Sequence, residues 1–518
     1  MKHSKLLVAA CALPLLLSSC GVDKGIVIWS PFGATYSEAI ANLIEAVKED
    51  TGYLITHESQ GSYPKILTNI KNSIANNSYP HIALGYPDHF ADYVKSKIML
   101  DLTPLIEKYD TAHGTKLLDD YYQEYMQENK EIQVGKIYGI PFNKSTEVMV
   151  YNVDLFKFIQ SKDNTITKVP ETWTDFHTDG VKMLKVLHDE GVYGKKVCAK
   201  HDNDGNPTEF TVADAAPSGY DVIADYKDFQ EASFNLLTFD SKDNLFITLL
   251  HQFGSEYTAY TDEEKQSRAQ RGHIEFWTPE HKPITINALK NIYQLYDAGN
   301  YAAKVFYPTT RLFNSNEFKL GQVLFNVCSS GGLSNNVPSL KFKVGVAPVP
   351  YTDATHKYVI SQGTNLGLFD KDMPEEELMK CVEIMVKLST GEMQGTWAAT
   401  TGYYPSSISA TNSVAYQALL NNTNKSNKTK VMYQESAKLN QEEYMGKDKG
   451  WIKYTDAAFV GSATIRDKIK TVIGTLCEKK GTIDAAVAGG KTFDQAFAEA
   501  CETVMNSIKG DLSDYWRE

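Results

Sequence analysis

Cysteine is scarce in this sequence and irregularly spaced. Its 518 residues include seven cysteines, and no two of them form a CxxC pair. Cys11 and Cys20 belong to the N-terminal segment, which leaves an odd set of five, and a chain of this size rarely depends on a disulfide framework. We therefore expect these five to be small buried hydrophobic residues. A single bridge between Cys477 and Cys501 is the alternative.

Sequence motifs of catalysis are also missing. The twelve histidines include no HExxH pair and no other metal-ligand spacing. Gly490-Lys491-Thr492 is not a phosphate-binding loop, because Ala485 stands where an upstream glycine is required. Residues 328–332 lack the first glycine of a nucleophile elbow. We expect no catalytic residue, no metal and no cofactor, although the paired carboxylates of glycan hydrolases need no linear motif and keep that class open.

Long apolar runs are absent beyond the N-terminus, so no later segment is expected to cross a membrane. Residues 6–17 are apolar, follow Lys2 and Lys5, and are too short to span a bilayer. The stretch ends in Leu-Ser-Ser-Cys20, which resembles the bacterial lipoprotein signal. That resemblance implies a signal peptide over residues 1–19 and a diacylglyceryl group on Cys20. An ordinary secretory signal is the alternative. Either places the protein in the cell envelope, at the outer face of the cytoplasmic membrane or in the periplasm.

Positive charge is in short supply as well. The formal net charge of −12 argues against nucleic acid as a partner and against a broad cationic membrane-binding face. It still admits an anionic ligand, because one buried Arg decides the charge of a pocket. At 57.8 kDa the chain exceeds one ordinary domain and should divide into two or more cores. No internal repeat is present, and we expect a monomer.

Strand and helix patterns alternate over the first hundred residues. This alternation predicts an α/β protein whose parallel sheet is covered by helices on both faces. Ligands of such sheets sit beyond the carboxyl ends of the strands, which singles out the loops after Trp29, Thr56 and Leu84. The predicted strands are 25–29, 53–56 and 81–84, and the predicted helices are 36–51, 63–75 and 89–95.

Residues 160–320 are predicted to be mostly helical, with a long loop or insertion at 199–217. Strand patterns return over residues 321–369, helical ones follow from 375, and 411–430 has the composition of a mobile surface segment. The economical arrangement puts both β-rich blocks in one sheet. It assigns residues 20–147 and 321–370 to an N-terminal lobe, and 148–320 and 371–518 to a C-terminal lobe.

Residues 139–156 form the most distinctive stretch. Gly139 and Pro141 predict a loop, residues 148–151 a short strand, and Asn152 a helix cap. From Pro141 to Phe156 the stretch resembles the signature of the family 1 extracellular solute-binding proteins, the ligand receptors of bacterial ABC importers. Only Phe158, where a charged or amide residue is usual, departs from it. The resemblance implies a two-lobed fold of the periplasmic-binding-protein type (class II), a ligand cleft between lobes joined by hinge crossings, and an ABC permease as partner.

Aromatic and acidic residues near loop starts are candidate ligand contacts. Tyr63 and Tyr403 each offer a ring to stack on a sugar or glycerol face and a hydroxyl that donates a hydrogen bond. Packing in the core is the alternative for both. Asp88 follows a predicted strand, so it either accepts hydrogen bonds from ligand hydroxyls or caps the next helix.

Four further positions complete the candidate site. Ser145 is held at the mouth of a sheet by the strand that follows it. Ser329 opens a Ser-Ser-Gly-Gly turn with exposed N–H groups, for which an ordinary turn is the alternative. Gly363 permits close backbone approach or forms a bulge. Arg466 has a planar fork suited to phosphate or carboxylate, unless it makes a surface salt bridge.

Taken together these residues resemble one branch of the family, the sn-glycerol-3-phosphate binding proteins. The branch has an acid where Pro87 stands here, one position before Asp88, and this later position is similar to maltose-type sugar binders. The branch also has tryptophans in the second lobe, whereas none lies between Trp173 and Trp277. Phe246, Phe253 or Tyr257 would replace them. The resemblance implies that Tyr63, Ser145, Ser329, Gly363, Tyr403 and Arg466 contact the ligand, with Arg466 facing a phosphate.

The sequence therefore predicts a lipid-anchored receptor that closes on glycerol 3-phosphate, a glycerophosphodiester or a related polyhydroxyl solute. An oligosaccharide stacked on tyrosines is the alternative ligand. A lipid-tethered glycan hydrolase, or a surface adhesin or sensor, are alternatives of other classes. On the phosphate hypothesis, Arg466→Ala abolishes phosphate-ester binding and spares a neutral glycan.

Overall fold

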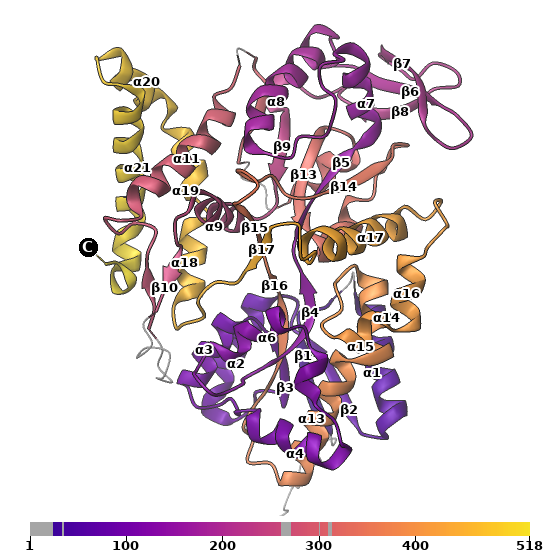
Figure 1. Cartoon of the computed structure of the whole chain (residues 1–518), viewed down its shortest axis with the longest axis vertical. Coiled ribbons are helices and arrows are strands. Elements are labelled where there is room, and N and C mark those ends of the chain that lie inside the picture. Colours follow the sequence, from indigo (N-terminus) through magenta and orange to yellow (C-terminus); the bar gives the residue numbers. More distant parts are fainter. Residues whose placement is uncertain (1–23, 34–35, 261–270, 300, 309–312, 518) are drawn as a thin grey trace, which may run out of the picture.

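The computed structural model describes residues 24–33, 36–260, 271–299, 301–308 and 313–517. These residues form two α/β lobes, each built on a five-stranded sheet (Figure 1). The two-lobed α/β architecture predicted from the sequence is confirmed. Among the described residues, no helix combines the length and the apolar character that spanning a membrane requires.

The N-terminal lobe is built on a sheet in the order β2-β1-β3-β16-β4. Strands β1 and β2 are parallel, as are β1 and β3, while β16 runs antiparallel to both β3 and β4. The three predicted N-terminal strands are confirmed, with the second one beginning two residues later. The strands are β1 (Ile26–Ser30), β2 (Ile55–Ser59), β3 (Ile82–Gly85), β4 (Ile140–Ser145) and β16 (Gln362–Leu368).

Helices cover both faces of this sheet. One face packs against α1 (Ser37–Thr51) and α13 (Glu375–Ser389), and the other against α2 (Tyr63–Ser73) and α3 (Pro87–Lys95). The predicted helix 36–51 corresponds to α1, whose apolar residues Ile40, Leu43, Ile44 and Val47 are buried. Smaller helices complete the lobe: α4 (Thr103–His113), α5 (Leu117–Asp120), α6 (Gln123–Lys130), α14 (Gly391–Thr401), α15 (Ile408–Thr411) and α16 (Val414–Leu420).

The loop predicted around Pro141 is wrong, because residues 140–145 form strand β4. Pro141 is compatible with a strand here since β4 lies at the edge of the described sheet, where β16 is its neighbouring strand and a single bridge to Tyr404 forms only at Lys144. The register also shifts at Thr364 and Asn365 beside Pro141. A proline lacks the N–H that an interior strand needs for its second neighbour, but an edge strand has only one neighbour.

The C-terminal lobe is built on a sheet in the order β12-β9-β13-β5-β14. Strands β12, β9 and β13 are parallel, whereas β5 runs antiparallel to β13 and β14. The strands are β5 (Glu147–Asn152), β9 (Asn235–Phe239), β12 (Lys304–Phe306), β13 (Val323–Ser329) and β14 (Val344–Ala347). The main helices around them are α7 (Val153–Lys162), α8 (Trp173–Asp189), α9 (Lys242–Phe253) and α11 (Lys282–Tyr296).

The predicted division of the chain needs correction at two places. Strands β13 and β14 were assigned to the first lobe but pair with β5 and β9 in the second. Helices α13 and α14 were assigned to the second lobe, yet α13 packs on β4, α4 and α1 of the first lobe, and α14 packs on α1. Local strand patterns do not reveal which sheet a strand joins, because pairing depends on partners far away in the sequence.

A separate three-stranded antiparallel sheet replaces the loop predicted at 199–217. It consists of β6 (Lys196–His201), β7 (Pro207–Ala213) and β8 (Asp221–Asp225) and extends from the upper lobe (Figure 1). The sequence did not predict this sheet because the segment is polar, and most of β7 is only half-buried. The segment 411–430, expected to be mobile, instead contains α16 and the start of α17 (Lys428–Leu439).

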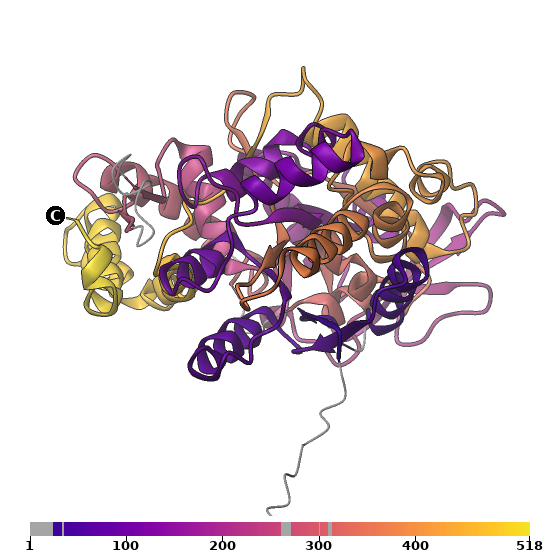
Figure 2. The same ribbon diagram turned by 90° about the horizontal axis from the view of Figure 1, so that it is seen from below.

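The C-terminal helices lie on one side of the molecule in both views (Figure 1, Figure 2). They are α18 (Ser462–Ile469), α19 (Val472–Glu478), α20 (Lys480–Ala488) and α21 (Phe493–Lys509). Cys477 and Cys501 lie on α19 and α21. Both are free and buried, as are Cys198, Cys328 and Cys381. The prediction of buried free thiols is confirmed for these five residues.

Two crossings between the lobes run side by side. Thr146 alone separates β4 from β5, and Ser361 alone separates β15 (Lys357–Ile360) from β16. The hydroxyl of Thr146 donates to the carbonyl oxygen of Ile360 at 2.5 Å. Strand β15 also pairs with β17 (Trp451–Tyr454), which lies between the lobes. The two single-residue crossings are therefore tied together.

A buried ion pair lies beside these crossings. Lys144, at the end of β4, is fully buried and donates to the carboxylate of Glu128, which is 5% exposed. Asn365 donates to the same carboxylate oxygen at 2.7 Å, and Lys144 also reaches the carbonyl oxygen of Gly363 at 3.4 Å. The crossing region is thus held by a charge-assisted network that links α6, β4 and β16.

Candidate functional site

A cavity of about 1030 Å³ lies between the two lobes. It is lined at the carboxyl ends of parallel strands, where α/β sheets bind ligands. Tyr86 and Asp88 follow β3, residues 240–244 follow β9, Tyr307 follows β12, and Ser329 ends β13. Of the three loops singled out in the sequence, the one after Leu84 contributes to this lining, and the described residues of the other two do not.

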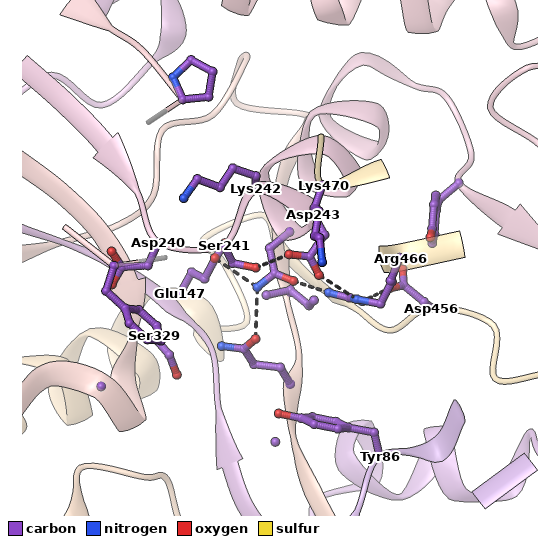
Figure 3. A pocket seen from close by; sticks show the side chains of 18 of the residues that line it. Tyr86, Glu147, Asp240, Ser241, Lys242, Asp243, Ser329, Asp456, Arg466 and Lys470 are labelled. Carbon is purple, nitrogen blue, oxygen red and sulfur yellow. Dashed lines mark hydrogen bonds and ion pairs between the residues drawn. The ribbon is translucent and has the colours of Figure 1, made fainter. Parts of the chain in front are cut away.

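Arg466, on α18, is held by three side chains at one end of the cavity. Its Nε donates to Asp243 Oδ2 at 3.0 Å, its Nη1 donates to Asp456 Oδ2 at 2.5 Å, and its Nη2 donates to Asn244 Oδ1. Figure 3 shows Asp243 and Asp456 converging on Arg466, with Tyr86 on the side of the other lobe. The guanidinium therefore joins α9, α18 and the loop after β17.

The two carboxylates outweigh the cation at this end. Burial alone would lower the pKa of the Arg466 guanidinium, but Asp243 and Asp456 raise it well above its usual range. Burial raises the pKa of Asp456, while Arg466 counteracts the rise. Asp88 also lines this end and adds a further carboxylate. Arg466 is thus fixed as a cation that its neighbours have already neutralised.

Acids outnumber cations among the described residues that line the cavity. There are seven carboxyl groups and four cations, and although Glu128 is paired with Lys144, the remaining acids still outnumber the cations, which disfavours an anionic ligand. The carboxyl groups belong to Asp88, Glu128, Glu147, Asp240, Asp243, Asp456 and Glu478, and the cations to Lys242, Lys319, Arg466 and Lys470.

Asn244 connects Arg466 to the crossings between the lobes. Its Nδ2 donates to Glu147 Oε1 at 3.0 Å and to Gln362 Oε1 at 3.1 Å. Glu147 is the first residue of β5 and Gln362 the first of β16, each directly after a crossing residue. The polar network therefore runs from the deep end of the cavity to the hinge.

Four of the seven predicted contacts line the cavity: Asp88, Ser329, Gly363 and Arg466. Asp88 lies in the first turn of α3, where its Oδ1 accepts from the N–H of His89 at 2.8 Å. It is not the N-cap, which is Tyr86. Gly363 has a φ of +109°, and an added Cβ would lie 2.1 Å from the carbonyl oxygen of Asn143. Only glycine fits this backbone.

The other three predicted contacts, Tyr63, Ser145 and Tyr403, are not among the described residues that line the cavity. Tyr63 packs edge-on against Tyr86 at 4.8 Å between ring centroids, and its hydroxyl accepts from Asn143 Nδ2 at 3.1 Å. Ser145 is 3% exposed. Tyr403 covers Gly331, since a Cβ there would lie 2.6 Å from its ring. These residues stay predictions as ligand contacts.

Several lining residues escaped the sequence reasoning. Asp243 and Asp456 resemble ordinary surface acids in sequence, and no linear signal links them to Arg466. Tyr257, named only as a substitute for a missing tryptophan, does line the cavity and is 2% exposed. Phe246 is instead buried against Phe276 at 5.2 Å. Phe253 is partly buried against the core, outside the described lining.

The lipid anchor and the absence of a metal site can be addressed only within the described residues. Cys20 lies outside the described residues, so its lipidation stays a prediction. Over the ranges that the structure describes, no group of three or more His, Cys, Asp and Glu side chains could hold a metal ion.

Solved structures with the same architecture are known. Over 94% of this chain, the fold is similar to UgpB from Mycobacterium tuberculosis in complex with glycerophosphocholine, with a TM-score of 0.62, 15% identity and 99% of that chain covered. The acarbose-binding GacH receptor of Streptomyces glaucescens matches over 95% of this chain and 98% of its own, with a TM-score of 0.58 and 14% identity. The similarity confirms the two-lobed binding-protein fold.

Sequence comparison adds the family. Over 149 residues the chain is 32% identical to the arabinooligosaccharide-binding protein of Bacillus subtilis, a match that covers 28% of this chain and 30% of that protein. The matched part is therefore less than a third of that relative. Residues 42–424 match the family described as bacterial extracellular solute-binding protein. The signature seen at residues 139–156 and this match agree, and the chain belongs to the bacterial extracellular solute-binding protein family.

Proposed function

We propose that this protein binds a neutral oligosaccharide in the cavity between its lobes and delivers it to an ABC importer, without catalysing a reaction. The observation that carries the proposal is the neutralisation of Arg466 by Asp243 and Asp456. A phosphate would have to displace two carboxylates from the guanidinium and then lie beside them. The geometry thus favours a neutral glycan, the alternative to the phosphate ligand.

The contacts of Arg466 also explain why a site for a neutral sugar contains an arginine. Two of its partners, Asp243 and Asn244, lie on α9, and the third, Asp456, lies in the loop after β17, so Arg466 on α18 cross-links the segments that form one wall. Its task is to order acceptor oxygens rather than to hold an anion. Asp88 and Asp456 are then placed to accept hydrogen bonds from ligand hydroxyls.

The size and the aromatic lining of the cavity support a ligand larger than a glycerol phosphate. About 1030 Å³ is at the upper end of small-molecule sites. Tyr86, Tyr257 and Tyr307 provide rings against which apolar sugar faces pack. The hydroxyl of Tyr257 has no hydrogen-bond partner in the described part of the protein, so it is available to a ligand oxygen.

A ligand panel tests this function. We expect arabinotriose or maltotriose, at about 100 times its Kd, to add about 2.7 kcal/mol to the free energy of unfolding. Glycerol 3-phosphate and glycerophosphocholine should add nothing measurable, because their phosphates meet an acidic lining. Thermal-shift assays followed by calorimetry measure both. Tight binding of the phosphates without binding of either trisaccharide would refute the proposal.

Tyr257→Phe tests whether the ligand reaches the cavity wall at Tyr257. The change removes only the hydroxyl, which makes no hydrogen bond to the described part of the protein, so the melting temperature should stay nearly unchanged. Trisaccharide affinity should fall about fivefold, as expected for one lost hydrogen bond of about 1 kcal/mol. Unchanged affinity would mean that the ligand does not reach Tyr257.

The proposal also includes the location of the protein. The family is extracellular, and the Leu-Ser-Ser-Cys20 sequence supports a lipid-anchored monomer at the outer face of the cytoplasmic membrane. In cells that express Cys20→Ser, the protein should lose its lipid label and leave the membrane fraction. A variant that remains lipidated at another position would contradict the anchor at Cys20.

A further inference from the structure

Glu147 is a buried carboxyl group that lines the cavity and has no role in the proposed function. It opens β5 directly after the crossing residue Thr146, and it lines the cavity although it is only 2% exposed. One side-chain oxygen, Oε1, accepts from Asn244 Nδ2 at 3.0 Å. Within the described chain Oε2 has no hydrogen-bond partner, which leaves it for a group inside the cavity.

The surroundings of Glu147 oppose a negative charge. Asp240 and Asp243 face it from the segment between β9 and α9, and Arg466, the cation that acts on Glu147, is already occupied by Asp243 and Asp456. Lys242, in the same segment, also lines the cavity, and its charge interacts with Asp240 and Asp243. Tyr444 and Tyr454 flank it from the segments around β17, and Cys328 from β13. None of these three supplies a positive charge.

The protonation of this group follows from its position. Burial raises the pKa of Glu147 to about 8, and the hydrogen bond from Asn244 offsets only part of the rise. An isolated buried carboxylate is costly, and such a group keeps its proton instead.

We propose that Glu147 is a further ligand-binding residue, which meets the ligand as an uncharged carboxylic acid and donates its proton in a hydrogen bond to a sugar oxygen. The inference rests on the proposed function, because it takes the cavity to hold a neutral oligosaccharide. A carboxylic acid offers both a donor and an acceptor, whereas the neighbouring carboxylates only accept. Glu147 would therefore recognise an ether or carbonyl oxygen that Asp88 and Asp456 repel.

The first arm of the test measures trisaccharide affinity against pH by calorimetry, with arabinotriose and maltotriose as probes. Binding by the wild type should weaken about tenfold between pH 7 and pH 9, since one pH unit above the pKa removes nine-tenths of the protonated form. Glu147→Gln keeps a donor and an acceptor, so its affinity should stay within about threefold of the wild type at pH 7 and should not fall by pH 9. Glu147→Ala should bind at least tenfold more weakly at pH 7.

The second arm needs no ligand and compares melting temperatures. An unfolded glutamate ionises near pH 4.5, whereas Glu147 in the folded protein does so near pH 8. The folded state holds the extra proton between these values, so wild-type stability should fall as pH rises from 5 to 8, relative to Glu147→Gln. The melting temperature of Glu147→Gln minus that of the wild type should therefore increase from pH 5 to pH 8. Glu256→Gln, an exposed position outside the cavity, should show no such trend.

The outcomes separate the inference from the proposed function. A constant melting-temperature difference between pH 5 and 8 overturns the inference whatever the ligand is, because Glu147 would then titrate normally. Trisaccharide binding that is equally strong at pH 7 and 9 in the wild type overturns the ligand contact while leaving the proposed function intact. If neither trisaccharide binds at either pH, the proposed function fails, and the contact with a sugar oxygen fails with it.

Discussion

Arg466→Ala should destabilise the protein by about 3 kcal/mol, because it leaves Asp243 and Asp456 as unpaired, largely buried carboxylates. The lower end of the range for buried pairs applies, since 26% of the Arg466 side chain remains exposed. Urea denaturation followed by tryptophan fluorescence measures the loss. Trisaccharide binding should be lost as well, because the wall that the guanidinium cross-links would no longer be ordered.

Two companion variants make this result specific. Lys468→Ala, on the same helix, removes an exposed ion pair with Asp511 and should cost less than about 1 kcal/mol. Adding Asp456→Asn to Arg466→Ala should recover part of the stability, because one stranded charge disappears. If Arg466→Ala were as stable as the wild type and lost only glycerol phosphate binding, the arginine would be a phosphate ligand and the oligosaccharide proposal would be wrong.

Gly363→Ala should be at least as damaging, with a loss of at least about 3 kcal/mol or failure to accumulate as folded protein. The backbone there has a φ of +109°, and the new Cβ would lie 2.1 Å from the carbonyl oxygen of Asn143 and 2.8 Å from the Cα of Lys144. Relief would require β16 to move away from β4, next to the crossing at Ser361. Expression yield and urea denaturation measure the effect.

Gly332→Ala is the matched control for this substitution. Gly332 lines the same cavity, but nothing lies within 4 Å of its added Cβ. The change should alter stability by no more than about 0.5 kcal/mol. Comparable damage from both substitutions would mean that the close contact at Gly363 relaxes without cost.

The sequence predicts those parts of the fold that depend on neighbouring residues. The helix α1 and the strand β3 follow from local apolar patterns, and the structure contains both. The polar strand β7 was not predicted because it has no fully buried residue and lacks the apolar/polar alternation that marks a half-buried strand. Strand β13 was recognised as a strand but placed in the wrong sheet, since its partners β5 and β9 are distant in sequence.

The same division holds for the candidate site. Asp88, Ser329 and Gly363 lie at or next to the ends of helices and strands, which sequence patterns locate. The partners of Arg466 on α9 could not be predicted, since Asp243 lies 223 residues away and becomes a neighbour only through the packing of α18 on α9. A free arginine predicts a phosphate ligand, whereas one held by two carboxylates favours a neutral glycan. The ligand class thus depended on long-range contacts.

The distribution of the polar side chains between the two lobes suggests the order in which they meet a ligand. Arg466, Asp243, Asn244 and Glu147 all belong to the C-terminal lobe, whereas Asp88 and Tyr86 come from the other. If the lobes swing apart about the crossings, the first group travels as one piece and keeps its hydrogen bonds. A sugar would therefore bind first to this preformed half of the site. Closure of the lobes would then bring α3 against the sugar and slow its dissociation.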